Sequence, residues 1–150
     1  RPQLQKEVTA IPIGKKLDAI GFLHTAMWVK GKPGEVLGSY MIHYKDGSSV
    51  QVPIINQKNI ADWWAKRDFP SALMAKVVSA PNGERYALYV TTWTNPHPDK
   101  LIKTLDMRSN GKAILALIAA TGVEREAKSN NKLESLSLRS HSSHKTFGGN

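Results

Sequence analysis

The stretch that decides the fold is EVLGSYMIHYKDGSSVQVPI, residues 35–54. Polar and apolar side chains alternate through 35–45 and again through 48–54, which is the period of a half-buried β-strand. Asp46-Gly47 lies between the two runs, and this dipeptide is a strong hairpin signal because glycine adopts a positive φ without a steric cost. The sequence therefore predicts a β-hairpin over 35–54.

Further β-forming segments lie on both sides of this hairpin, with turn residues between them. Pro12 marks 6–13 as an edge strand or strand end, and 17–29 is apolar on both faces, as in a central strand. After the hairpin come 72–80, 84–93, 100–108 and 112–121. The last of these is short and flanked by turns, which favours a strand over a buried helix. About eight strands without a βαβ pattern predict an all-β protein, a β-sandwich or jelly roll.

One long connection interrupts the strand pattern. Residues 55–71 read INQKNIADWWAKRDFPS and show no alternation. They are compatible with a helical turn around 59–66 that Asp62 would cap. Long ordered connections in compact domains often carry function, so this segment is the first place to look for a site.

Length and composition fit one folded domain. The chain has 150 residues, 41% hydrophobic and 22% charged, which fits a globular core and excludes a disordered chain or a fibre. The strand pattern ends near residue 123, and within 129–150, 12 of 22 residues are Ser, Thr, Asn or Gly. We therefore expect a β-sandwich module over 1–123 and a polar, flexible tail or linker over 124–150.

The missing cysteines and the short apolar runs exclude several kinds of site and protein, and the charge favours one kind of surface. Without cysteine there are no disulfides, thiolate metal sites or cysteine nucleophiles. No apolar run approaches the roughly 20 residues of a membrane-spanning helix. The net charge is +9, but the basic residues are spread along the chain, most densely at Lys30 and Lys32 with Lys15 and Lys16 upstream. This spread favours a generally basic surface over a dedicated anion site.

The sequence contains no recognisable catalytic motif. The aspartates form no pair of the kind that glycosidases place across a bond, and nucleophile-elbow, zinc-protease and phosphate-loop motifs are absent. A Ser-His-Asp triad assembled in space stays open, but a non-enzymatic role is favoured. His141 and His144 are spaced like half a metal site in the polar tail, and we expect this spacing to be incidental. A structural Ca²⁺ held by carbonyls and one carboxylate also stays open, because such a site leaves no sequence signature.

Tryptophans in two loops are the most informative residues. A sugar ring presents an apolar C–H face ringed by hydroxyls, so its binder combines an exposed flat ring with polar side chains that pair with the hydroxyls. Both loops hold these residue types together. The candidate ligand-binding residues are Trp63, Trp64, Asn59, Asp62 and Arg67 in the long connection and Trp93, Asn95 and His97 in the proline-rich loop.

The same aromatic residues also have a structural interpretation. Tryptophan is buried on average, so a core position is favoured for Trp93. Of Trp63 and Trp64, we expect one to point inward and the other to lie near the surface. His24 lies on an apolar strand and is expected to be a hydrogen-bonded core histidine, whereas His43 is expected to face solvent.

Four segments carry a resemblance to a known superfamily. They are FLHTA (22–26), GSYMIHYKDG (38–47), NIADWW (59–64) and LYVTTWTNPHP (88–98). In this order they resemble accessory β-sandwich modules of the galactose-binding-domain-like superfamily, and the resemblance spans roughly 8–122. Such modules occur in secreted multidomain bacterial proteins, often beside glycoside hydrolases. The resemblance implies a jelly roll with its ligand site on loops at one end, a secreted or cell-envelope location and a non-catalytic role. One departure is that 79–85 (SAPNGER) lacks an aromatic platform, which weakens the case for an extended sugar-binding surface.

These observations favour a carbohydrate-binding module of a larger protein, with a polysaccharide or oligosaccharide as ligand. The alternative is a structural or interaction domain that packs against a catalytic neighbour and has no ligand of its own. Such a domain would expose an apolar patch rather than a groove. A nucleic-acid binder is less favoured, because it would need basic and aromatic residues together on one face. An enzyme is the least favoured of the four.

Overall fold

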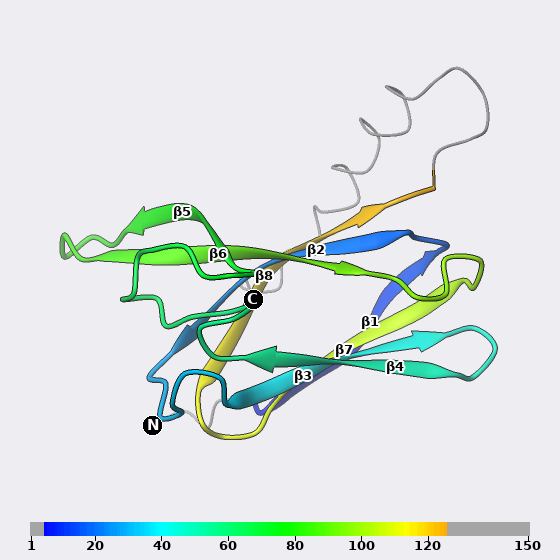
Figure 1. Cartoon of the computed structure of the whole chain (residues 1–150), viewed down its shortest axis with the longest axis horizontal. Helices are drawn as coiled ribbons and strands as arrows, with labels where there is room; N and C mark the ends of the chain where they lie inside the picture. Colours follow the sequence, from blue (N-terminus) through cyan, green and yellow to red (C-terminus); the bar gives the residue numbers. More distant parts are fainter. Residues whose placement is uncertain (1–4, 126–150) are drawn as a thin grey trace, which may run out of the picture.

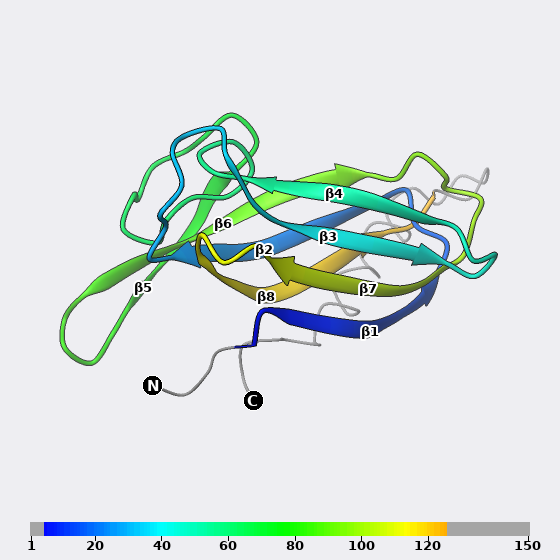
Figure 2. The same cartoon turned by 90° about the horizontal axis from the view of Figure 1, so that it is seen from below.

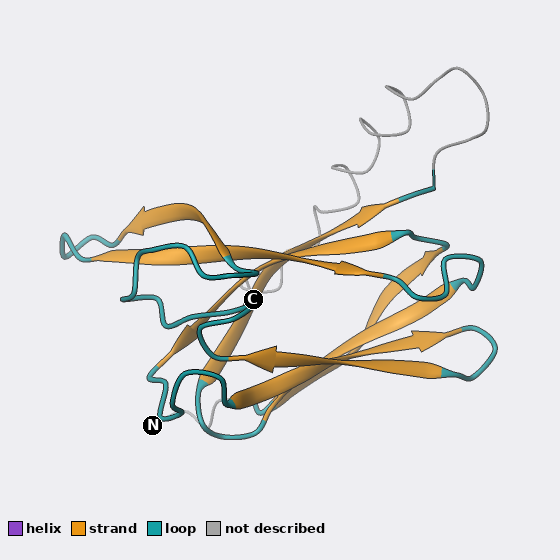
Figure 3. Ribbon diagram, in the orientation of Figure 1, coloured by secondary structure: helices purple, strands orange, loops and turns teal. Residues whose placement is uncertain are grey.

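The computed structural model describes residues 5–125, which form eight antiparallel strands in two sheets (Figure 1). No helix occurs among the described residues, and turns and loops join the strands (Figure 3). The strands are β1 Glu7–Lys15, β2 Ala19–Met27, β3 Val36–Tyr44, β4 Ser49–Ile55, β5 Leu73–Ser79, β6 Arg85–Thr94, β7 Ile102–Ser109 and β8 Ile114–Val123. The prediction of an all-β sandwich is confirmed, including a strand rather than a helix over the last apolar run.

Each sheet holds four strands, in the orders β1-β7-β3-β4 and β5-β6-β2-β8. Figure 2 shows the first sheet with β1 and β4 at its two edges. The chain changes sheet at every connection except the β3–β4 and β5–β6 hairpins, so both layers are built from residues far apart in sequence. The edge position of β1 agrees with Pro12, which has no amide hydrogen to donate to a second neighbour.

The β3–β4 hairpin is the one predicted over 35–54. Tyr40 lies opposite Val52 and Ile42 opposite Val50, so the apolar faces of the two strands coincide. Gly47 turns the chain with a φ of 90°, a conformation that suits a residue without Cβ. The strand alternation and the Asp-Gly turn thus set the register together.

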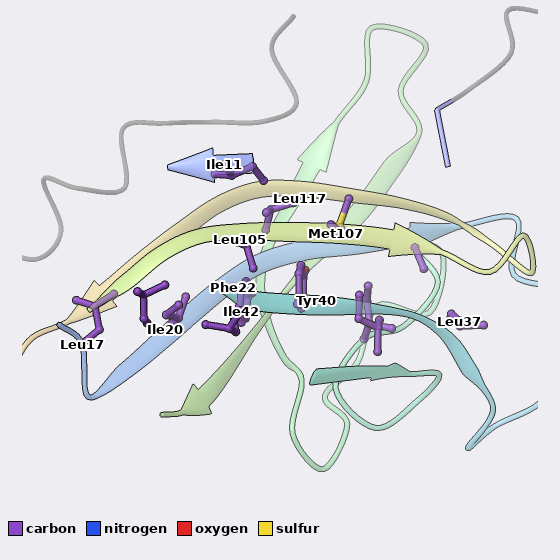
Figure 4. Packing of buried hydrophobic residues seen from close by; sticks show 14 of the residues in the cluster. Ile11, Leu17, Ile20, Phe22, Leu37, Tyr40, Ile42, Leu105, Met107 and Leu117 are labelled. Atoms are coloured by element: carbon purple, nitrogen blue, oxygen red, sulfur yellow. The ribbon is translucent and has the colours of Figure 1, made fainter. Parts of the chain in front are cut away.

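The core fills the space between the sheets (Figure 4). Phe22 of β2 stacks on Tyr40 of β3, with ring centroids 4.0 Å apart and planes 6° apart. His24 lies beside them: Tyr40 Oη donates to its Nδ1 (2.5 Å), and its Nε2 donates to the Asn59 carbonyl (2.8 Å). The prediction of a hydrogen-bonded core histidine is confirmed. Burial lowers the pKa of His24 to about 4, because a site away from water disfavours the imidazolium.

His43 faces solvent as expected, since its side chain is 39% exposed. It also has a partner that was not predicted: its Nε2 lies 2.7 Å from Oδ2 of Asp106 on the neighbouring strand β7. The reason is the sheet order, which brings a carboxylate 63 positions away in sequence beside this histidine.

The connection between β4 and β5 is not helical, so the interpretation of a helical turn around 59–66 is wrong. Residues 61–63 instead run between the end of β2 and the start of β6, where these two strands separate. The Trp63 amide donates to the Ala26 carbonyl (2.8 Å), and the Ala87 amide donates to the Trp63 carbonyl (2.8 Å). Ala26 also donates to the Ala61 carbonyl at 3.1 Å. These hydrogen bonds to neighbouring strands replace the i→i−4 bonds of a helical turn.

Candidate functional site

Three tryptophans and one tyrosine gather at the end of the sandwich where β2 stops and β6 starts. Trp63 lies at the centre, with its ring centroid 5.7 Å from that of Trp28, 6.1 Å from Trp64 and 4.2 Å from Tyr86. Trp64 also lies 5.1 Å from Tyr86. We call these four residues the aromatic patch. It joins three segments, the residues after β2, the long connection and the start of β6.

Two rings of the aromatic patch face solvent. Trp28 is 61% exposed and Trp64 is 48% exposed, whereas Trp63 is partly buried and stacks on Tyr86. Trp63 and Trp64 therefore divide as expected, one inward and one at the surface. Flat exposed rings of this size offer the apolar face on which a sugar ring or another planar ligand can stack.

Asp62 fixes the two exposed tryptophans relative to each other. Its Oδ1 accepts a hydrogen bond from the Trp64 amide (3.0 Å), and its Oδ2 accepts one from the Val29 amide next to Trp28 (3.2 Å). A carboxylate that accepts two amides holds both loops more firmly than neutral partners would. Asp62 is thus a positioning residue, and it neither caps a helix nor presents a free oxygen pair to a ligand.

The backbone at the aromatic patch is strained. Trp28 has a φ of 49°, as has Lys66, whose Nζ lies 5.8 Å from the centroid of the Trp64 ring. The left-handed region costs a non-glycine residue roughly 1–3 kcal/mol. Trp63 adds a second cost, because its Nε1 is buried and makes no hydrogen bond to the described residues. Unfavourable features thus concentrate where the exposed rings are.

Sequence reasoning missed two members of the aromatic patch. Trp28 falls within the central strand predicted over 17–29, but β2 ends at Met27 and the left-handed backbone turns Trp28 outward. The Gly31-Lys32-Pro33-Gly34 turn that follows was the available signal for an earlier strand end. Tyr86, the second missed member, comes immediately after the segment 79–85, which holds no aromatic residue. Its hydroxyl donates to Glu84 Oε2.

No family model, curated protein or solved structure matches this chain.

Asn59 and Trp93, predicted on separate loops, line one cavity of about 210 Å³ beside β4 and β6. Trp93 is partly buried and packs against the core, as favoured from the sequence. The Asn59 side chain is already bonded twice: Oδ1 accepts from the Ile55 amide (2.7 Å) and Nδ2 donates to the Pro53 carbonyl (2.8 Å). Asn59 therefore shapes its own loop and has little capacity left for a ligand.

Asn95 and His97 lie at the other end of β6, roughly 30 Å along the strand from Tyr86. Asn95 is 4% exposed. Its Oδ1 accepts from Tyr44 Oη (2.5 Å), and its Nδ2 donates to the Leu17 carbonyl (2.7 Å). This amide joins three segments of the core, while His97 packs edge-on against Tyr44. The structure therefore does not bring these two residues to the aromatic patch.

Arg67 stacks its guanidinium on Phe69, with Cζ 4.1 Å from the ring centroid, and both residues lie in the long connection. Of the eight residues predicted for ligand binding, the aromatic patch includes Trp63 and Trp64, with Asp62 supporting them.

Within 5–125 no group of three or more His, Asp and Glu side chains is arranged to hold a metal ion. His141 and His144, and the predicted tail beyond residue 125, lie outside the described residues. Over the same part of the chain, no helix is long and apolar enough to cross a membrane.

Proposed function

We propose that this chain is a non-catalytic carbohydrate-binding module and that the aromatic patch is its ligand platform. The observation that carries the proposal is the exposure of Trp28 and Trp64 on either side of Trp63. Exposed tryptophan rings on neighbouring connections suit the stacking of sugar rings, because the apolar face of an aromatic ring pairs with the C–H face of a sugar.

The loss of folding stability at the aromatic patch supports a functional role for its arrangement. An exposed tryptophan in a left-handed backbone and a buried, unpaired indole N–H both lower stability. Large exposed apolar groups are also unfavourable in water. The Asp62 carboxylate nevertheless accepts two amide hydrogen bonds, which hold this surface in one geometry before any ligand arrives. Such preorganisation lowers the entropy lost on binding.

The resemblance to galactose-binding-domain-like accessory modules agrees with this proposal. It adds the expectation of a secreted or cell-envelope protein, in which the module would hold a neighbouring catalytic domain close to a polysaccharide. Three of the four patch residues, Trp28, Trp63 and Trp64, lie on connections at one end of the sandwich, where the resemblance would place a ligand site.

The test is affinity electrophoresis of the chain in gels containing neutral and acidic polysaccharides, at low and moderate salt. Trp28→Ala and Trp64→Ala should each abolish retardation that the original chain shows. Leu73→Ala, which removes an apolar side chain that is 60% exposed on β5, is the matched control and should leave retardation unchanged. Equal retardation of all four proteins would overturn the role of the aromatic patch.

One observation favours the second candidate, an interaction domain. The edge strand β5 exposes Leu73, Met74 and Val78, and within residues 5–125 it pairs with β6 alone. Exposed edge strands bind other chains through unpaired backbone groups. A domain of this kind would show no glycan retention, and a neighbouring domain of the same protein would protect β5 amides from hydrogen exchange.

A further inference from the structure

The aromatic patch borders a second hollow. A groove of about 500 Å³ lies at the open edge of the sandwich, between β1 of one sheet and the start of β8 of the other. Its apolar lining comes from Val8, Met107, Ile114 and Leu115, and Trp28 forms one of its walls. Trp28 therefore belongs to both surfaces, so the aromatic patch and the groove meet at this residue.

The side chains that line the groove carry a net positive charge. Lys6 and Lys30 both line it, and neither forms an ion pair with any described residue. Glu7 is the acidic side chain in the described lining, and it pairs with Arg108, whose Nε lies 2.8 Å from Glu7 Oε2. The Lys30 amide donates to the Lys112 carbonyl (2.7 Å), which fixes the backbone from which this lysine extends.

The opposite end of the sandwich is different. There Lys15 pairs with Glu124 (3.7 Å), Lys100 with Asp46 (3.0 Å), and Arg125 with Asp99 (2.9 Å). Three cations at that end are thus matched by carboxylates, while Lys45 and Lys103 there form no ion pair with a described residue. Lys6 and Lys30 differ from Lys45 and Lys103 because they line a groove with apolar walls.

We propose that the ligand is an acidic polysaccharide, with sugar rings stacked on Trp28 and Trp64 and an anionic group bound by Lys6 and Lys30 in the groove. This inference rests on the proposed carbohydrate-binding function and names the class of sugar. An ammonium group beside apolar walls interacts with a carboxylate or sulfate more strongly than in open water, because the effective dielectric is lower. The apolar walls meanwhile accept the C–H faces of the sugar.

The experiment measures affinity of the full chain for pairs of probes that share a sugar backbone and differ in charge. One pair is polygalacturonate and its fully methyl-esterified form, and the other is a sulfated galactan and the same galactan after desulfation. Titration calorimetry at moderate salt should show at least roughly tenfold tighter binding of one acidic member than of its neutral partner. Equal binding of each pair's members would overturn the inference while leaving the proposed function intact.

Matched double variants distinguish an anion site in the groove from a general effect of the protein's positive charge. Lys6→Gln with Lys30→Gln should weaken binding of the acidic probe roughly tenfold or more and leave the neutral probe unchanged. Lys45→Gln with Lys103→Gln removes the same two charges from exposed positions at the opposite end, where neither lysine forms an ion pair with a described residue. This control should leave binding unchanged at moderate salt. Equal weakening by both doubles would overturn the groove as an anion site.

Two further binding results would overturn the inference. Polyglutamate or single-stranded DNA that binds as tightly as the acidic glycan would overturn sugar recognition in favour of charge or nucleic acid. Failure to bind any glycan, acidic or neutral, would overturn the proposed function together with the inference. Trp28→Ala should weaken both members of a probe pair, because its ring serves the sugar rather than the charge.

Discussion

Acidification should destabilise this protein through one buried histidine. His24 is 1% exposed, and its two ring nitrogens bond to Tyr40 Oη and the Asn59 carbonyl as the neutral tautomer. Its pKa is about 4 in the folded protein and about 6.5 in an unfolded chain. The unfolded chain therefore takes up the proton first as the pH falls. Stability is complete above about pH 6.5 and declines between pH 6.5 and pH 4.

The expected loss follows from the two pKa values. Linkage gives about 2 kcal/mol lost by pH 5 and about 3 kcal/mol lost by pH 4, a large share of the 5–15 kcal/mol that domains usually have. Carboxylates with a lowered pKa affect stability only at lower pH. Hydrogen bonds from Ser48 and Lys100, for example, lower the pKa of Asp46 to about 2. The His24 effect should therefore appear before the carboxylate effect.

The assay is urea unfolding of the chain between pH 4 and pH 8, followed by circular dichroism. His24→Gln keeps a side-chain amide able to donate to the Asn59 carbonyl and removes the titrating group. The variant should be less stable than the original at pH 7, and its free energy of unfolding should change little between pH 6.5 and pH 5. A flat profile for the original chain in this window would refute the reasoning, and so would an equal slope in the variant.

Three further predictions concern residues that shape the sandwich. Asn95→Ala should cost about 2–4 kcal/mol in urea unfolding, because it leaves the buried Tyr44 hydroxyl and the Leu17 carbonyl unpaired, while glycan affinity stays unchanged; lost affinity would place Asn95 at the site after all. Gly38→Ala should cost about 3 kcal/mol or more, because the new Cβ would overlap the Arg108 carbonyl oxygen, and a stability within 0.5 kcal/mol of the original would contradict this packing. Asp62→Ala should cost about 2 kcal/mol and also weaken glycan binding by releasing both tryptophan loops, which unchanged affinity at full folding would disprove.

The strands were predictable because their signals are local. Alternation and Asp46-Gly47 set the β3–β4 hairpin, and the apolar strand around His24 became central β2 with the histidine bonded inside. These patterns reflect burial of one or both faces, which a sequence period records directly.

The candidate site was predictable only in part, because its geometry depends on which strands separate. The sequence showed the residue types of the long connection but not that 61–63 would lie between β2 and β6, which removes the helical turn. Nor does residue type show whether a side chain is already bonded. Asn59 and Asn95 have side chains that could bind sugar hydroxyls, yet both side-chain amides are hydrogen-bonded to other groups of the protein. Trp28 was missed because the predicted strand ran to residue 29, two residues too far, whereas β2 ends at Met27 and the left-handed backbone turns Trp28 outward.

The most direct test of the central claim follows the indole N–H signals of the four tryptophans by NMR during titration with a retained polysaccharide fragment. Substitution of each tryptophan assigns its signal. The account predicts that the signals of Trp28 and Trp64 shift in a saturable way and that the signal of Trp93, which packs against the core, stays in place. Shifts confined to Trp93, or no shift at saturating glycan, would contradict a ligand platform at the aromatic patch.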